Sequence, residues 1–279
     1  MGDHDVVTVE PVAGGSINDA FRAELESGDV AFVKSRDGAR IADFEAEAAG
    51  LRWLGEADVR VPAVLEVGRD DPWLALEWIE PGSLSPGGAE ELGQALAALH
   101  RAGANAHGAL PPGSPDRILR LGSVEVELSE RESWSDVYAD VLLRPLVARA
   151  IDAERLDERD AGAIAAVSGR IAEVAGDPED PSRLHGDLWG GNVLAASDGR
   201  AWLIDAAAYG GHREIDLAML RLFGAPSDRI FAAYEEAYPL ADGHNERVAL
   251  WQILPLIVHA ILFGGAYGRS AGDAARRFL

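Results

Sequence analysis

The hydrophobic and polar positions follow two different periods along the chain. Before residue 80, short apolar or alternating runs are bounded by Gly, Asp or Ser, a pattern typical of strands. Between residues 39 and 56, apolar residues instead recur at steps of three and four, which predicts one amphipathic helix. The expected strands are 6–9, 20–25, 30–34, 64–67 and 73–79.

The second part of the chain reads mainly as helix. Residues 80–88 are rich in Pro, Gly and Ser and form the best linker candidate. A hairpin is expected at 193–196 and 201–205, between segments of helical period. We therefore expect an α+β, bilobal protein, with a small antiparallel β-rich lobe at 1–80 and a larger, mainly α-helical lobe at 81–279. The expected helices are 89–101, 134–153, 158–175, 214–222, 228–237 and 245–263.

Charge and composition exclude several classes of function. A formal net charge of -22 repels phosphate, and the arginines are scattered among acidic residues, so we expect no nucleic-acid partner. The first residues lack the basic and apolar regions of a signal peptide, and no stretch suggests a membrane span. With no cysteine, disulfides and thiolate chemistry are excluded. We expect a cytoplasmic location, no membrane association and no obligate protein partner.

The strongest chemical signal is the segment from His185 to Asn192, followed by Asp205 at the end of the expected hairpin. Phosphoryl transfer needs a carboxylate that orients the attacking hydroxyl, and oxygen ligands for magnesium. Asp187 suits the first task, and Asn192 and Asp205 suit the second. This order matches the catalytic and metal-binding loops of protein kinases, with Gly186 where those have Arg. Each residue alone would fit an ordinary turn or helix cap.

Two further features would complete an ATP site. Gly14, Gly15 and Ser16 lie between two expected strands, where glycine lets backbone amides approach phosphate, although a plain hairpin turn has the same composition. Lys34 is the only lysine in a chain with 25 Lys and Arg residues. A compact ammonium suits phosphate oxygens, and Glu47 on the following helix is placed to hold it. The alternative is an exposed Lys34 and a solvated Glu47.

With these residues in place, the sequence resembles the fructosamine kinase family, relatives of aminoglycoside phosphotransferases within the protein-kinase-like superfamily. The resemblance covers most of the chain. Trp189 in His-Gly-Asp-Leu-Trp and the string Gly-His-Arg-Glu-x-Asp-Leu-Ala-Met from Gly211 to Met219 separate it from generic antibiotic kinases.

The resemblance implies phosphorylation of the 3-hydroxyl of a ketosamine, free or protein-bound, with ATP and Mg²⁺, in deglycation. By the same analogy Glu77, Trp78 and Ile79 form a hinge whose backbone binds adenine. Trp189, His212 and Glu214 are expected towards the sugar. Asp216 is expected to brace the catalytic loop through backbone hydrogen bonds.

At several positions the sequence differs from the family's pattern, so the resemblance does not fix the identity of the phosphoryl acceptor. The family's Asp-Asn-x-Ile-Gly stretch is replaced by residues 116–122, its proline after the metal aspartate by Ala206, and a later aromatic residue by Gly210. A kinase of another alcohol, such as an aminoglycoside or a choline-like metabolite, is the alternative. A hypothesis from a different functional class is a nucleotide-binding pseudokinase without activity. However, the sequence keeps the expected lysine, catalytic base and metal ligands.

Overall fold

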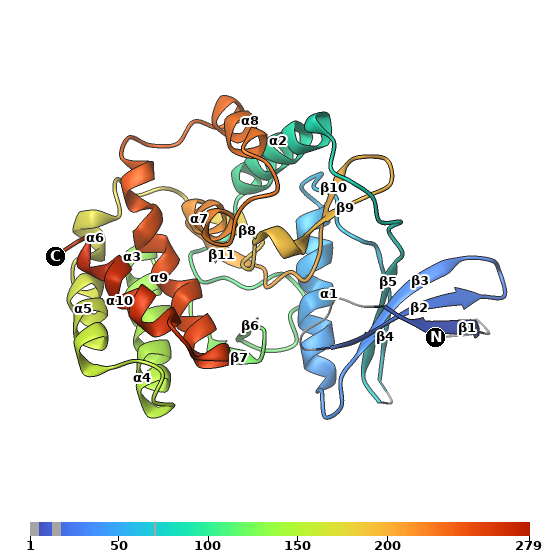
Figure 1. The fold of residues 1–279 in the computed structure, drawn as a ribbon, viewed down its shortest axis with the longest axis horizontal. Coiled ribbons are helices and arrows are strands. Elements are labelled where there is room, and N and C mark those ends of the chain that lie inside the picture. The colour runs from blue at the N-terminus through green and yellow to red at the C-terminus, as the bar shows by residue number, and fades with distance from the viewer. Residues whose placement is uncertain (1–5, 13–17, 70) are drawn as a thin grey trace.

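The computed structural model describes residues 6–12, 18–69 and 71–279. Five strands form an antiparallel sheet in the order β1-β2-β3-β5-β4, which lies at one end of the molecule (Figure 1). All five strands coincide with expected ones, which confirms the α+β prediction. Their bounds are β1 (Val6–Pro11), β2 (Asp19–Leu25), β3 (Val30–Ser35), β4 (Val64–Gly68) and β5 (Trp73–Glu77).

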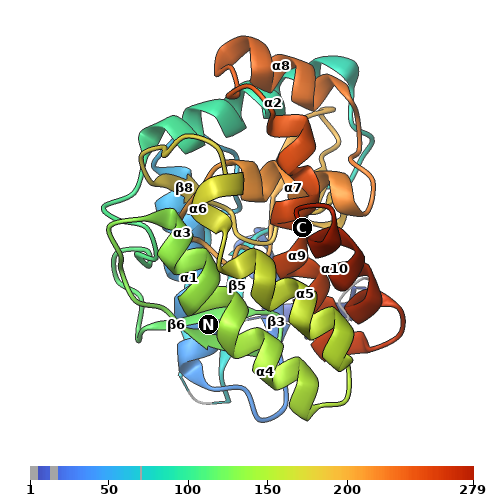
Figure 2. The ribbon, with the colours of Figure 1, turned by 90° about the vertical axis from the view of Figure 1, so that its left-hand side faces the viewer.

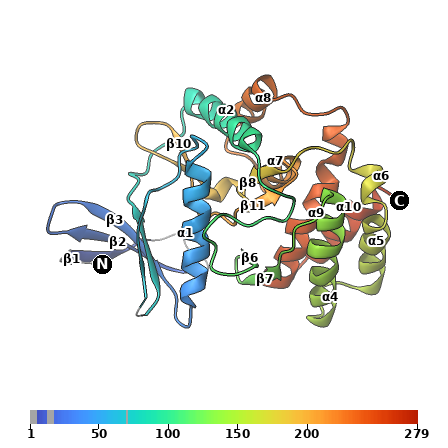
Figure 3. The same ribbon diagram turned by 180° about the vertical axis from the view of Figure 1, so that it is seen from behind.

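Helix α1 (Ile41–Gly55) lies between the sheet and the helical part of the chain (Figures 1 and 3). Its buried residues Phe44, Leu51 and Leu54 join one hydrophobic core with residues of the sheet and of the helical part. This core extends to Leu188 and Leu203, which flank the candidate catalytic residues. Helix α1 therefore couples the sheet to the rest of the chain, and the division at residue 80 stays a prediction.

A second hydrophobic core holds the helical end of the molecule together. It is built around fully buried Tyr138 and Trp251, and Figure 2 shows the helices that surround it. Helices α2 (Pro86–Ala102) and α8 (Arg229–Ala237) pack into the first core instead. The other helices beyond residue 80 are α3 (Trp134–Asp136), the π-helix η1 (Val137–Leu143), α4 (Arg144–Asp152), α5 (Glu158–Ser168), α6 (Ile171–Val174), α7 (Glu214–Leu222), α9 (His244–Phe263) and α10 (Tyr267–Arg276).

Several elements differ from expectation for identifiable reasons. Helix α2 begins inside the expected linker, because the Ser85 hydroxyl caps it and Pro86 suits its first turn. Helix α10 is not expected from the sequence because its buried face consists of Gly and Ala, so the helix beyond Tyr267 has no large apolar side chain to mark a buried face. The hairpin of β9 (Val193–Ala195) and β10 (Ala201–Leu203) is confirmed. Two strand pairs were not predicted: β6 (Ile118–Leu121) with β7 (Val124–Glu127), and β8 (Ser182–Leu184) with β11 (Tyr209–Gly211).

Helix α9 corrects one expectation about hydrophobic segments. Its 20 residues are long and apolar enough to cross a membrane by length and composition. However, 61% of the most apolar window is buried inside the protein, as expected of a core helix. Arg247, near its start, is buried in an ion pair with Glu214.

Candidate functional site

The loop between β8 and β9 places Asp187 beside Asn192. The short 3₁₀ turn η2 (Gly190–Asn192) brings the Asn192 Nδ2 group to 3.0 Å from Asp187 Oδ2 and 2.8 Å from the Asp187 carbonyl oxygen. Gly186 has φ +83°, and a Cβ there would lie 1.9 Å from the Ala207 oxygen. Only glycine fits this turn, which explains why arginine is absent from it.

The side chain of Asp216, on α7, fixes the backbone of this loop. Its carboxylate is fully buried and accepts the backbone N–H groups of His185 at 2.7 Å and Gly186 at 3.0 Å. His100 Nε2 lies 3.3 Å from the same carboxylate. The bracing role expected for Asp216 is confirmed by these contacts. A buried carboxylate with several donors fixes the backbone that carries Asp187.

Lys34, Glu47 and Asp205 form one ionic cluster from three separate elements. Lys34 Nζ lies 2.5 Å from Glu47 Oε1 and 2.7 Å from Asp205 Oδ1. Lys34 is only 3% exposed, so the reading of it as a surface residue is wrong. Burial disfavours its charge, but Glu47 and Asp205 outweigh that effect and raise the pKa of Lys34. Lys34 is therefore charged at neutral pH.

Asp205 stands at a strained backbone position that faces solvent. Its φ is +56°, in the left-handed region that a non-glycine residue rarely adopts. Its side chain is 52% exposed, whereas Lys34 beside it is buried. Partial desolvation within the cavity opposes ionisation of the carboxyl, but Lys34 lowers the pKa of Asp205 below its ordinary value. Asp205 is therefore ionised at neutral pH.

Burial raises the pKa of Asp187 to about 6, although the hydrogen bond from Asn192 opposes the increase. This value already includes the effect of the nearby carboxylates of Asp205 and Asp216, which disfavour a further negative charge. Asp187 is thus ionised at pH 7.5, yet it accepts a proton more readily than an ordinary aspartate. This is a property that a general base near neutral pH requires.

The pKa of Asp187 predicts an unusual dependence of stability on pH. A folded pKa of about 6, against 3.8 for an ordinary aspartate, means that the folded state loses stability as pH rises through this window. In the presence of a chelator, Asp187→Asn should stabilise the protein at pH 7.5 by up to roughly 3 kcal/mol, since one pKa unit corresponds to about 1.4 kcal/mol. Thermal unfolding from pH 7.5 to 4.5 should show this gain shrinking as the pH falls. An equal or lower melting temperature at pH 7.5 would contradict the assignment.

One cavity of about 790 Å³ contains most of the residues predicted for the site. Its lining includes Lys34, Glu47, Asp187, Trp189, Asn192 and Asp205, together with Glu77, Trp78 and Ile79 from the end of β5. The Trp78 indole donates to Glu80 and packs with Arg22 at 5.6 Å, so its side chain is already engaged. Gly14, Gly15 and Ser16 lie outside the described residues.

Trp189 lies at the edge of this cavity and is 39% exposed. A Cβ on Gly191 would lie 2.2 Å from the Trp189 ring, so the indole rests directly against the loop backbone. Phe223 is oriented nearly perpendicular to the Trp189 ring, with 6.3 Å between ring centroids. The cavity therefore offers an accessible aromatic surface beside Asp187.

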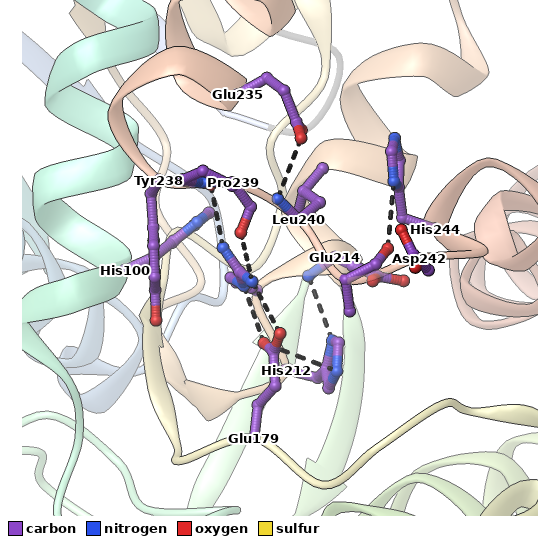
Figure 4. A network of polar contacts seen from close by, with 12 residues as sticks. His100, Glu179, His212, Glu214, Glu235, Tyr238, Pro239, Leu240, Asp242 and His244 are labelled. Carbon is purple, nitrogen blue, oxygen red and sulfur yellow. Dashed lines mark hydrogen bonds and ion pairs between the residues drawn. The ribbon is translucent and has the colours of Figure 1, made fainter.

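The structure does not bring His212 and Glu214 to the cavity. Both are buried, and neither is among its lining residues. His212 stacks on Trp251 at 5.1 Å and lies 3.8 Å from Glu179, in the polar network of Figure 4. Glu214 pairs with Arg247 at 2.6 Å and accepts the Trp251 indole at 2.7 Å. Their side chains therefore connect the start of α7 to Glu179 and to helix α9, away from the cavity.

Comparisons with known proteins agree with this arrangement. A family model described as fructosamine kinase matches residues 2–279. A protein named "Probable ketoamine kinase" from Staphylococcus aureus is 30% identical over 278 residues, covering 99% of this chain and 94% of that protein.

Solved structures show the same fold. A crystal structure described as a fructosamine-3-kinase of Thermobifida fusca has TM-score 0.89 and 42% identity, covering 98% of this chain and 94% of that one. A choline kinase of Streptococcus pneumoniae has TM-score 0.62 at 16% identity, covering 98% and 92%, and therefore shows likeness of fold alone. The family model, the similar sequences and the shared fold together show that this chain belongs to the fructosamine kinase family.

Proposed function

We propose that this protein transfers the γ-phosphoryl group of ATP to the 3-hydroxyl of a ketosamine, a product of amine glycation, from a cytoplasmic location. One observation supports it above all. The Asp187–Asn192 pair and the Lys34–Glu47–Asp205 cluster line one cavity, beside an accessible Trp189. Family membership supports the choice of a ketosamine over another alcohol.

In this proposal, separate residues of the cavity bind ATP and activate the acceptor. Lys34, held by Glu47, binds phosphate oxygens of ATP. Asp187 orients the acceptor hydroxyl and accepts its proton as the phosphoryl group is transferred in line. Backbone groups of Trp78 and Ile79, just past the end of β5, are proposed to bind adenine, because the Glu77 N–H already donates to the Ala63 carbonyl oxygen at 2.8 Å. The side chains of Glu77 and Trp78 are engaged by the Ala63 N–H and by Glu80.

The oxygen atoms near Asp187 fit a magnesium ion. Asn192 uses its Nδ2 group on Asp187, which leaves its side-chain carbonyl as a ligand. Asp205 gives Oδ1 to Lys34 and retains Oδ2. No group of three or more His, Cys, Asp or Glu residues that could hold a metal occurs among the described residues. Two protein oxygens suit Mg²⁺, which also takes phosphate oxygens and water and would neutralise charge on the phosphates.

Trp189 is proposed to contact the acceptor through its exposed indole face. A ketosamine presents sugar C–H groups and a protonated amine, both of which an aromatic ring binds. Trp189→Leu should raise the KM of the ketosamine about tenfold and leave the KM of ATP nearly unchanged. Steady-state kinetics with each substrate varied would measure this. Phe263→Leu, an exposed aromatic outside the cavity lining, is the matched control, and an unchanged acceptor KM in Trp189→Leu would remove Trp189 from the proposal.

A comparison of acceptors tests the proposed function. Fructosyl-lysine, ribulosyl-lysine, an aminoglycoside and choline would be supplied with Mg–ATP, and ADP release would be followed. We expect kcat/KM to be highest for one of the two ketosamines. A higher value for the aminoglycoside or choline would favour the other alcohol kinases. ATP binding without turnover on any acceptor would favour a pseudokinase.

A further inference from the structure

The carboxylate of Asp43 is the meeting point of three arginines at the start of helix α1. It accepts Arg36 Nη2 at 2.9 Å, Arg40 Nη2 at 2.8 Å and Arg120 Nε at 2.8 Å. It also accepts the backbone N–H of Arg40 at 3.1 Å, which caps the first turn of the helix. The side chain of Asp43 is only 15% exposed, whereas that of Arg40 is 54% exposed, so the contacts of Asp43 with Arg36 and Arg120 are the more shielded ones.

Arg120 is the one of these arginines that comes from the helical part of the chain. It lies on β6, in the hairpin with β7, and its own orientation is fixed by Asp116 at 2.6 and 2.9 Å and by the Ile118 oxygen at 2.9 Å. The side chain is 10% exposed. Because a guanidinium is planar and its donors have a fixed geometry, Arg120 meets Asp43 already oriented. It therefore fastens the start of α1 to the β6–β7 hairpin.

A second arginine of the helical part holds the other end of α1. Arg183 on β8 donates to the Trp53 carbonyl oxygen and lies over the Trp53 ring at 4.6 Å. It also lies 3.3 Å from Glu56, just past the end of the helix. Strand β8 leads directly into the loop that carries Asp187. Helix α1 is thus fixed at both ends by elements that surround the catalytic loop.

The contact at Asp43 bears directly on Glu47. Residues four apart lie on the same helix face, one turn from each other. Any shift of this part of α1 would move Glu47 away from Lys34, whose 2.5 Å contact leaves little tolerance. We infer that Asp43 and Arg120 are positioning residues, which hold α1 so that Glu47 keeps Lys34 in place for ATP. This inference rests on the proposed function, in which Lys34 binds phosphate.

A double-mutant cycle tests whether Arg120 acts through Glu47. Arg120→Met, Glu47→Gln and the double variant would be compared with wild type by the dissociation constant of Mg–ATP and by kcat/KM for ATP. We expect each single change to lower kcat/KM about tenfold or more, and the double variant to be no worse than Glu47→Gln. Arg120→Lys should recover part of the loss. Losses that multiply in the double variant, as for direct contact of Arg120 with substrate, would overturn the inference.

A matched control separates positioning from general loss of stability. Arg276 pairs with Asp160 at 2.7 Å and joins α10 to α5, and neither residue lines the cavity. Arg276→Met should lower the melting temperature without changing kcat/KM for ATP, measured where all variants are folded. An equal loss of activity in Arg276→Met and Arg120→Met would overturn the inference. The dissociation constant of Mg–ATP is measured without an acceptor, so this half of the cycle tests the inference even if no ketosamine is phosphorylated. A wild type that binds ATP but phosphorylates no ketosamine would contradict the proposed function alone.

Discussion

Asp187→Asn should lower phosphoryl transfer to a ketosamine by roughly 10²- to 10⁴-fold while leaving the affinity for Mg–ATP nearly unchanged. Asparagine has the same shape and can still accept the hydrogen bond that Asn192 donates at 3.0 Å. The bracing contacts of Asp216 go to the backbone and would remain. The change therefore removes the negative charge of residue 187 and its ability to take a proton, while its hydrogen bond with Asn192 is kept.

Single-turnover kinetics and calorimetric titration with Mg–ATP would measure the two quantities separately. If the variant kept wild-type turnover, Asp187 would not be the base. If it lost ATP affinity and turnover in equal measure, residue 187 would act in nucleotide binding instead.

Lys34→Arg should reduce kcat/KM for ATP about a hundredfold even though the charge is conserved. Lys34 is 3% exposed and its Nζ contacts two carboxylates at 2.5 and 2.7 Å. A guanidinium is larger and forked, so it would displace Glu47 or Asp205 to fit. Lys34→Met, which removes the charge at similar length, should be at least as severe.

The measurement for Lys34 is steady-state kinetics with ATP varied, combined with the melting temperature of each variant. A folded Lys34→Arg protein with wild-type kcat/KM would show that Lys34 is not a phosphate ligand. The inverse pattern, a normal KM for ATP with low turnover, would assign Lys34 to a later step of the reaction.

The residues of the catalytic loop can be predicted from the sequence because they lie close together along the chain. The spacing of Asp187, Asn192 and Asp205 depends on one turn and one hairpin, both of which have local signals. The contact of Lys34 with Glu47 also follows a simple order of strand and helix. Gly14, Gly15 and Ser16 stay a prediction, since they lie outside the described residues.

Contacts between distant segments were harder to predict. His212 and Glu214 follow Asp205 closely in the sequence. However, their partners Glu179, Arg247 and Trp251 hold them in a buried network. Polarity alone does not distinguish a substrate contact from a satisfied buried group.

The Arg120–Asp43 contact joins residues separated by 77 positions, and its hairpin was not anticipated. A signal was present, since the apolar residues of 118–127 alternate around Gly122 and Ser123. The substitution of the family's Asp-Asn-x-Ile-Gly stretch marked this segment as different, but only the fold shows that it reaches helix α1.

The position of the transferred phosphate tests the central claim most directly. The wild-type protein would be incubated with Mg–ATP and a ketosamine, with Asp187→Asn as the blank, and the product examined by phosphorus and proton NMR. The account predicts one phosphate ester on the 3-hydroxyl of the sugar, formed by the wild type and formed at least about a hundredfold more slowly by the variant. A phosphate on another hydroxyl, or no phosphorylated ketosamine from folded, ATP-binding protein, would contradict it.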